Sequence, residues 1–249
     1  MRYEMMFPHQ LRQALKQNRP AVLPVGVLEY HAEHCVLGVD TLLVIRALEL
    51  LEKELDLVLF PPFYYGAASY VVEPPENNGT VQVGAPALLE FARPLFASLL
   101  RVGFRNIHLF IHHQSENFAD GMPTDLAFKL AARQATFEFL EKQRGENWWG
   151  DPAMRDYYQR NEAGANPFNW IRVHPFMSAE AQARYPIDHA GRQETSLMLA
   201  FCPEGVDDTR RRAAKKWYSA SAGQADLKYG RAARRLILDG MRRALQGAA

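Results

Sequence analysis

Alternation of strand-like and helix-like segments is the feature that most constrains how this chain can fold. Ala21 to Val27 is apolar and rich in valine, which is typical of a buried strand, whereas the leucines after Asp40 recur at helical spacing. The later segments are predicted as strands over 57–60, 80–83 and 106–112, and as helices over 86–100, 123–141, 197–201 and 225–245. This alternation favours a layered α/β fold in which helices flank a mainly parallel central sheet. We expect a single domain over residues 1–249, because a chain of this length can bury one large core.

Two acids and a histidine are grouped where the first predicted strand ends. Glu29 and His31 follow the strand, and Asp40 lies where the next helix begins. If the backbone stays extended, Glu29 and His31 point to the same side, since side chains two residues apart share a face. The three residues would converge at the carboxyl end of a strand, where open α/β sheets place their ligands. The alternative interpretation is an N-cap aspartate and two polar residues on a surface loop.

Charge and cysteine content limit the classes of partner. Lys and Arg total 29 against 28 Asp and Glu, so the net charge is +1 and gives no reason to expect a polyanionic partner. We interpret the basic run over 210–216 as a solvated helix face, not as a nucleic-acid site. Two cysteines, Cys35 and Cys202, argue against a disulfide framework and fit a reducing compartment. We also find no apolar run of membrane-spanning length and no secretory pattern, so we expect a cytoplasmic protein without a membrane partner.

The histidines are unevenly distributed. Five of the eight fall in three short clusters: His31 with His34, His112 with His113, and His189. Each cluster lies at or just past a predicted strand end or helix start, and acidic residues are nearby in each case. A lone histidine is more often structural than a ligand. Three acid-and-histidine clusters at equivalent topological positions together favour a metal site.

Four short segments occur in an order that resembles one enzyme family. They are Glu29-Tyr30-His31 with Asp40, Gly66 to Ser69 with Gly79-Thr80, Gly103 to Asn106, and His189 to Ser196. Three of these segments resemble motifs of the creatininase (creatinine amidohydrolase) family, and Gly103 to Asn106 resembles the segment that precedes the third motif of that family. The last match, His-Ala-Gly-x-x-Glu-Thr-Ser, is the most specific, because its six specified residues agree in order and spacing over eight positions. The resemblance covers most of the chain and implies a creatininase-like layered α/β domain that hydrolyses a small-molecule substrate.

The resemblance also implies a pair of divalent metal ions. Asp40 would bridge them, Glu29 and Gln114 would complete one position, and His31 and Glu116 would complete the other. Oxygen and nitrogen ligands without sulfur suit Zn²⁺ or Mn²⁺, with one or two ions per chain.

The same resemblance implies catalytic roles for two further residues. His189 matches the catalytic histidine of the family, which would move a proton to or from the reacting group near neutral pH. Glu194 would orient His189, or would fix the orientation of the metal ligands by hydrogen bonds to them. The alternative for Glu194 is the ordinary polarity of a helix start.

The third motif departs from the family pattern and leaves the histidine ligand open. Aligning Glu116-Asn117 with the end of the motif puts Gln114 where the family has its metal-binding histidine. A glutamine amide oxygen is a neutral and weaker ligand, so that metal position would be weak. The alternatives are that His113 is the ligand, with one residue inserted before Glu116, or that His112 compensates through a different local backbone.

The substrate is less well defined by the sequence. Ser69 and Tyr185 are predicted to bind it, and Tyr185-Pro186 replaces a tryptophan and an aspartate of creatininase, which argues against creatinine itself. We expect hydrolysis of a C–N bond in a small cyclic amide or formamide. The alternatives are ring opening of a keto-cyclitol or cyclic keto-sugar, and a degenerate member that binds small molecules without turnover. The resemblance also implies a homohexamer.

Overall fold

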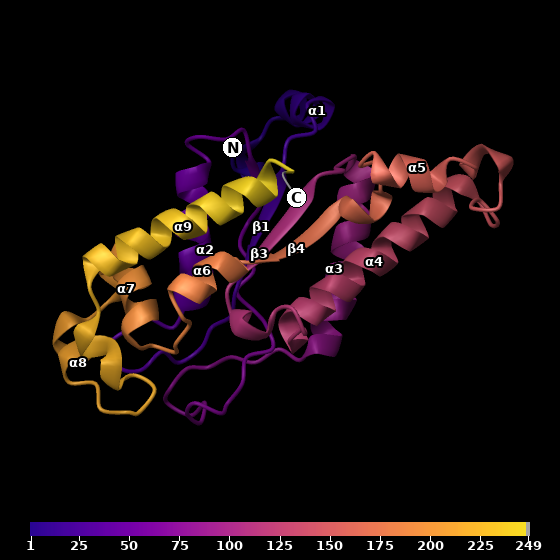
Figure 1. Ribbon diagram of the computed structural model, residues 1–249. Coiled ribbons are helices and arrows are strands. Elements are labelled where there is room, and N and C mark those ends of the chain that lie inside the picture. The colour runs from indigo at the N-terminus through magenta and orange to yellow at the C-terminus, as the bar shows by residue number, and fades with distance from the viewer. Residues whose placement is uncertain (248–249) are drawn as a thin grey trace.

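The computed structural model, which describes residues 1–247, is built around one four-stranded sheet (Figure 1). The strands are β1 (Ala21–Val25), β2 (Val58–Leu59), β3 (Ile107–Ile111) and β4 (Ile171–Pro175). They lie in the order β2-β1-β3-β4, and every neighbouring pair is parallel. In register, Val22 of β1 is paired with His108 of β3, which is paired in turn with Arg172 of β4. The predicted parallel α/β architecture is therefore confirmed.

Helices fill most of the chain between the strands. They are α1 (Pro8–Lys16), α2 (Val39–Leu51), α3 (Ala85–Val102), α4 (Pro123–Arg144), α5 (Tyr157–Glu162), α6 (Ala179–Arg184), α7 (Arg192–Phe201), α8 (Asp208–Arg212) and α9 (Leu227–Leu245). Sequence chemistry explains several of their ends. Pro86 occupies the first turn of α3, where its missing N–H costs nothing, and Asp226 caps α9 by accepting hydrogen bonds from the backbone N–H groups of Lys228 and Tyr229.

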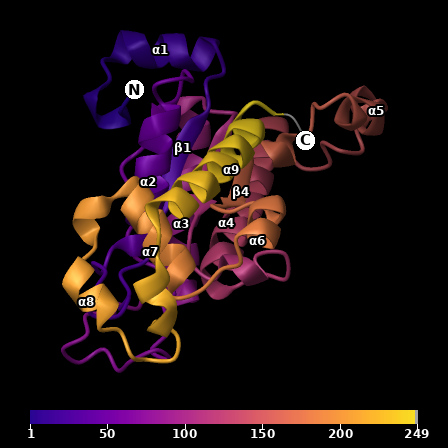
Figure 2. The ribbon, with the colours of Figure 1, turned by 60° about the vertical axis from the view of Figure 1, so that its left-hand side comes forward.

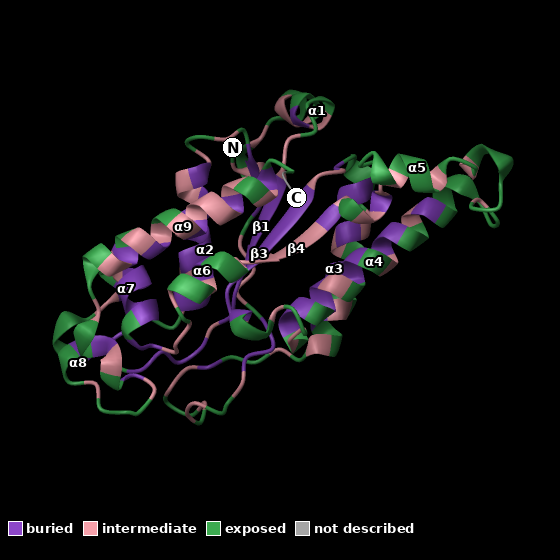
Figure 3. Ribbon diagram, in the orientation of Figure 1, coloured by how far each residue is buried: buried purple, intermediate pink, exposed green. Residues whose placement is uncertain are grey.

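The sheet has a hydrophobic core on each face. Helices α2, α6, α7 and α9 cover one face, and α3 and α4 cover the other (Figure 1). Strand β1 contributes to both, because Val22 packs into the first core and Leu23 into the second, as the alternation of side chains along a strand requires. All five residues of β1 and all five of β3 are buried (Figure 3). Buried on both faces, these strands hold the carboxyl edge of the sheet in a fixed position.

Some elements differ from the sequence-based expectation. Residues 80–83 form only isolated bridges, Leu28 with Val81 and Gly66 with Gln82. Strand β4 was not predicted, because Arg172 and His174 interrupt its apolar run. The segment that contains α5 extends away from the sheet beyond the end of α4, as both views show (Figures 1 and 2).

None of the helices in the described range 1–247 is long and apolar enough to cross a bilayer. The last two residues of the predicted domain, 248 and 249, lie outside the described part of the chain.

Candidate metal centre and active site

The carboxyl end of β1 and the start of α2 bring three of the predicted site residues together. The chain leaves β1 through Gly26, where a Cβ atom would lie 2.5 Å from the backbone nitrogen of Thr41. Only glycine allows the start of α2 to approach the strand this closely. Asp40, in the first turn of α2, therefore lies beside Glu29 and His31, and all three side chains are buried. The predicted convergence of these residues is observed.

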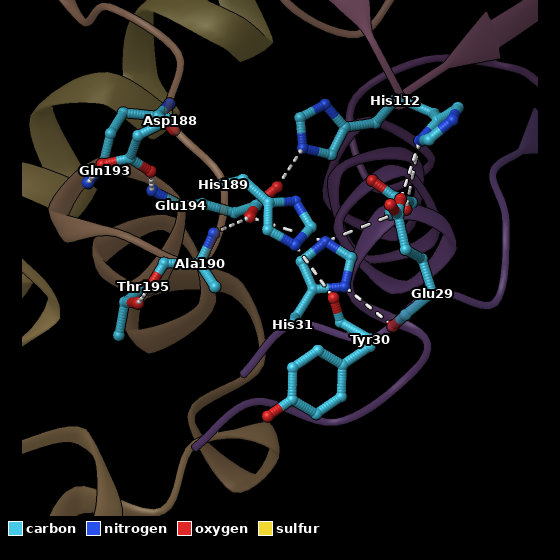
Figure 4. Close-up of polar contacts among 12 residues, drawn as sticks. Glu29, Tyr30, His31, His112, Asp188, His189, Ala190, Gln193, Glu194 and Thr195 are labelled. Atoms are coloured by element: carbon cyan, nitrogen blue, oxygen red, sulfur yellow. Dashed lines mark hydrogen bonds and ion pairs between the residues drawn. The ribbon is translucent and has the colours of Figure 1, made fainter. Parts of the chain in front are cut away.

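Asp40 is shared by two groups of possible ligands. In the first, His113 Nδ1 lies 3.1 Å from Glu29 Oε2 and 3.8 Å from Asp40 Oδ2. In the second, His31 Nε2 lies 3.9 Å from Asp40 Oδ2 and 3.5 Å from Glu194 Oε2. Figure 4 shows the labelled side chains of Glu29 and His31, from the segment after β1, gathered near that of Glu194 from the start of α7. Atoms that share a zinc ion at about 2 Å lie about 3 to 4 Å apart, so each group has the spacing of a ligand set.

The chemistry of these residues also fits divalent ions. The donors are carboxylate oxygens and imidazole nitrogens, the set that Zn²⁺ and Mn²⁺ accept. Among the residues described, Asp40 Oδ2 is buried without a hydrogen-bond partner, and the Asp40 side chain has only histidine nitrogens as ionic neighbours. A buried carboxylate oxygen left in this way is costly unless a cation satisfies it.

The pKa shifts of the cluster reflect its tight packing. Burial opposes charge on His31, but Glu194 and Asp40 outweigh it and raise the pKa of His31 to about 10. Burial likewise raises the pKa of Asp40, although nearby histidines oppose the shift. The pKa of Glu29 is lowered in spite of its burial, because His113 donates a hydrogen bond to it. Without metal, the raised pKa values of His31 and His113 favour protonated rings beside the carboxylates. With metal, the same positions would be held by cations.

Glu194 is held firmly in the centre by its neighbours. Its Oε2 accepts a hydrogen bond from the backbone N–H of Ala190 at 2.7 Å, and its Oε1 lies 3.2 Å from His112 Nε2. The backbone N–H of Glu194 itself donates to Asp188 Oδ1 at 3.0 Å. Asp188 thereby fixes the start of α7, and His112 fixes the carboxylate from the β3 side (Figure 4).

His189 lies beside the two groups with a defined orientation. Its ring stacks on His31 with the centroids 4.6 Å apart, and its Nε2 donates to the backbone carbonyl of Tyr30 at 2.9 Å. The carbonyl oxygen can only accept, so Nε2 carries the proton. In the tautomer with one proton, the other ring nitrogen, Nδ1, carries the lone pair that can accept a proton.

The structure resolves the histidine alternatives in favour of His113. Gln114 adopts a left-handed backbone conformation, with φ 51° and ψ 35°, directly after His113. His113 therefore occupies the position beside Glu29 and Asp40 that the first alignment gave to Gln114. The arrangement is the one expected for a residue inserted before Glu116.

The same insertion displaces the second predicted carboxylate. Glu116 is an exposed residue of a 3-10 turn (Ser115–Asn117) and is not within the ligand groups found among the described residues. Glu194, predicted to orient His189, lies instead beside His31 and Asp40. Glu194 is buried in the first turn of α7, which is unusual for an ordinary polar residue at a helix start, but this burial is visible only in the structure.

A cavity of about 480 Å³ opens onto the centre. It is lined by Glu29, Asp40, Ser69, Val71, Val72, His112, His113, Gln114, Ser115, Glu116, Ile187, Asp188, His189, Glu194, Trp217 and Tyr218. Ser69 is thus placed where substrate could reach it. Tyr185 is not among the lining residues, and instead packs edge-to-face on Tyr229 with centroids 5.1 Å apart. Trp217 and Tyr218 were not predicted, because they follow the last recognisable motif.

Comparison with known proteins gives consistent matches. A sequence model of the family described as "Creatininase: Creatinine amidohydrolase" matches residues 4–242. A 3-dehydro-scyllo-inosose hydrolase of Thermotoga maritima is 26% identical over 204 residues, which is 81% of this chain and 56% of that protein. A creatinine amidohydrolase of Pseudomonas putida is 26% identical over 191 residues, which is 75% of this chain and 65% of that protein. The matches therefore span less than two thirds of the length of these relatives.

Solved structures share the fold. A structure described as "Creatininase Mn" superposes with a TM-score of 0.69 at 19% identity, and the match covers 99% of this chain and 98% of that one. A creatininase mutant described as "Zn-Zn type" superposes with the same TM-score and identity, over 99% and 97% of the two chains.

Proposed function

The chain belongs to the creatininase family, and from this premise we propose that it is a metal-dependent hydrolase of a small ring substrate. One observation carries the proposal: two ligand groups share the buried carboxylate of Asp40 at the base of a cavity that His189 also lines. Glu29, Asp40 and His113 would hold one ion, and His31, Asp40 and Glu194 the other. Zn²⁺ or Mn²⁺ bound there would polarise a substrate carbonyl and lower the pKa of water.

His189 would transfer the proton. The hydrogen bond from Nε2 to the Tyr30 carbonyl fixes the ring, so Nδ1 can accept a proton and return it to the leaving group. His112 and the Ala190 N–H hold Glu194 from both of its oxygens, which keeps its orientation constant during turnover.

Two substrate classes remain candidates. The first is a cyclic amide or formamide, hydrolysed at its C–N bond and different from creatinine. The second is a keto-cyclitol or cyclic keto-sugar, which is favoured by the similarity to a 3-dehydro-scyllo-inosose hydrolase. A non-catalytic role is less well supported now that His113, not Gln114, lies beside Glu29 and Asp40, because this arrangement leaves a histidine in each ligand group.

Substitution of His189 tests the proposed division of roles. We expect His189→Ala to retain the metal content of the unmodified protein while turnover falls by roughly 10²-fold or more, the usual scale for loss of a general acid or base. Metal content is measured by mass spectrometry and turnover by screening cyclic amides, formamides and keto-cyclitols. Loss of an ion from His189→Ala would instead make His189 a ligand, since one of its nitrogens lies within 4.8 Å of ligand atoms of Glu29 and His31.

A further inference from the structure

We propose that Gln114 recognises the substrate and does not bind metal. Its side-chain amide oxygen accepts a hydrogen bond from an N–H or hydroxyl group on the substrate ring. The inference rests on the proposed function, because it assigns a specificity-determining role within the same cavity. It makes the substrate a neutral ring that carries a hydrogen-bond donor.

The backbone at Gln114 separates it from the metal ligands. A left-handed conformation is uncommon for residues other than glycine, and such conformations are enriched at functional sites. The Gln114 carbonyl accepts from the backbone N–H of Asn117 at 3.2 Å, which closes the turn. While His113 points to Glu29 and Asp40, Gln114 lies on the adjoining wall of the cavity, where Ser69 also lies.

The amide oxygen of Gln114 is buried and unsatisfied. Within residues 1–247, neither Gln114 Oε1 nor the neighbouring Ser115 Oγ has a hydrogen-bond partner, although both residues line the cavity. A buried acceptor without a donor is unfavourable, and native proteins seldom leave one without a reason. A ligand that brings an N–H or O–H group to this wall would satisfy it.

The remaining walls define the rest of the ligand. Neither lysine nor arginine is among the described residues that line the cavity, whereas Glu116 and Asp188 are, so a substrate with a phosphate or carboxylate would lack a basic partner outside the metal centre. Trp217 and Val71, which are 90% and 86% exposed, form an apolar part of the lining. A flat or saturated ring could lie against this apolar surface while its donor faces Gln114.

Paired probes that differ by one donor test the inference without a known substrate. The first pair is 2-pyrrolidinone and N-methyl-2-pyrrolidinone, and the second is 2-hydroxycyclohexanone and cyclohexanone. Dissociation constants are measured by NMR titration of the zinc-loaded protein. We expect the donor-bearing member of at least one pair to bind about tenfold more tightly, the effect of one hydrogen bond. Whichever pair shows the difference indicates whether the donor is an amide N–H or a ring hydroxyl.

A matched pair of variants assigns the effect to Gln114. Gln114→Ala should abolish the preference for the donor-bearing probe. Gln134→Ala should keep it, because Gln134 has the same buried, unpaired amide oxygen but lies on α4 and not among the cavity-lining residues. Zinc content should be unchanged in both variants. A preference that persists in Gln114→Ala, no preference in the unmodified protein, or loss of zinc from Gln114→Ala would each overturn the inference.

The two proposals can fail separately. A protein that binds two zinc ions and distinguishes the paired probes, but hydrolyses none of the screened rings, would contradict the proposed function and support the role of Gln114. A protein that hydrolyses such a ring but does not distinguish the paired probes would support the function and contradict the role of Gln114.

Discussion

At the scale of the residue, His31 shows how the metal-free and metal-bound states of the centre differ. Its pKa is raised to about 10 against an ordinary value near 6.5, although burial opposes the shift, because Glu194 and Asp40 favour the protonated ring. A metal ion requires the neutral ring, so binding must displace this proton. The protonated ring stabilises the metal-free fold below about pH 6.5, and this contribution is lost as the pH rises toward 10.

We therefore predict that metal affinity rises with pH. Between about pH 6.5 and 10, the zinc association constant should increase by about tenfold per pH unit for each proton displaced. Calorimetry at pH 7.5 in two buffers of different ionisation enthalpy should show proton release on zinc binding. An affinity that is constant over this range, with no proton released, would show that His31 is already neutral in the metal-free protein.

Gln114 and His113 also show, at this scale, what could not be predicted from the sequence pattern. The predicted cluster of Glu29, His31 and Asp40 is observed because short-range features set it: a strand, a glycine that admits the helix, and an aspartate in the first turn of that helix. Whether Gln114 or His113 faces Glu29 and Asp40 depends on the backbone conformation of Gln114, just after the end of β3. One inserted residue changes which side chain faces the site, and neither composition nor periodicity records it.

At the scale of the element, β3 and β4 are joined by a histidine pair, the buried His108 and the half-buried His174. His108 Nδ1 lies 3.0 Å from His174 Nε2, and His108 Nε2 lies 2.8 Å from Asn106 Oδ1. Burial, with His174 and Arg172 nearby, lowers the pKa of His108 to about 3, and burial with Arg172 lowers that of His174 to about 4. His174, which interrupts the apolar pattern of β4 and kept this strand from being predicted, therefore also attaches β4 to β3.

This pair predicts an acid-sensitive sheet. The unfolded chain would protonate these histidines below about pH 6.5 while the folded chain does not, so stability should fall as the pH decreases from 6.5 toward 4. The slope contributed by His108 should be at most about 1.4 kcal/mol per pH unit. Denaturant titrations of His108→Gln should show a smaller loss between pH 7 and 5, and His9→Gln, at an exposed position, should match the unmodified protein. Equal losses in both variants would exclude the pair as the cause.

At the scale of the whole molecule, more of the fold than of the site could be predicted from the sequence. Alternating apolar segments defined β1, β3 and the helices around them, because burial on both faces of a parallel sheet leaves continuous apolar runs. The cavity was not predictable in the same way. Its walls come from segments far apart in sequence, and Trp217 and Val71 lie on loops without periodicity. The homohexamer stays a prediction from family resemblance.

The metal content of two carboxylate variants tests the central claim most directly. If Glu194 and not Glu116 completes the second ligand group, zinc-loaded protein and Glu116→Gln should each hold two ions per chain, and Glu194→Gln should hold one or fewer. Mass spectrometry gives the stoichiometry, and anomalous scattering from crystals should place the two ions about 3.5 to 4 Å apart on either side of Asp40. One ion in Glu116→Gln together with two in Glu194→Gln would contradict the account.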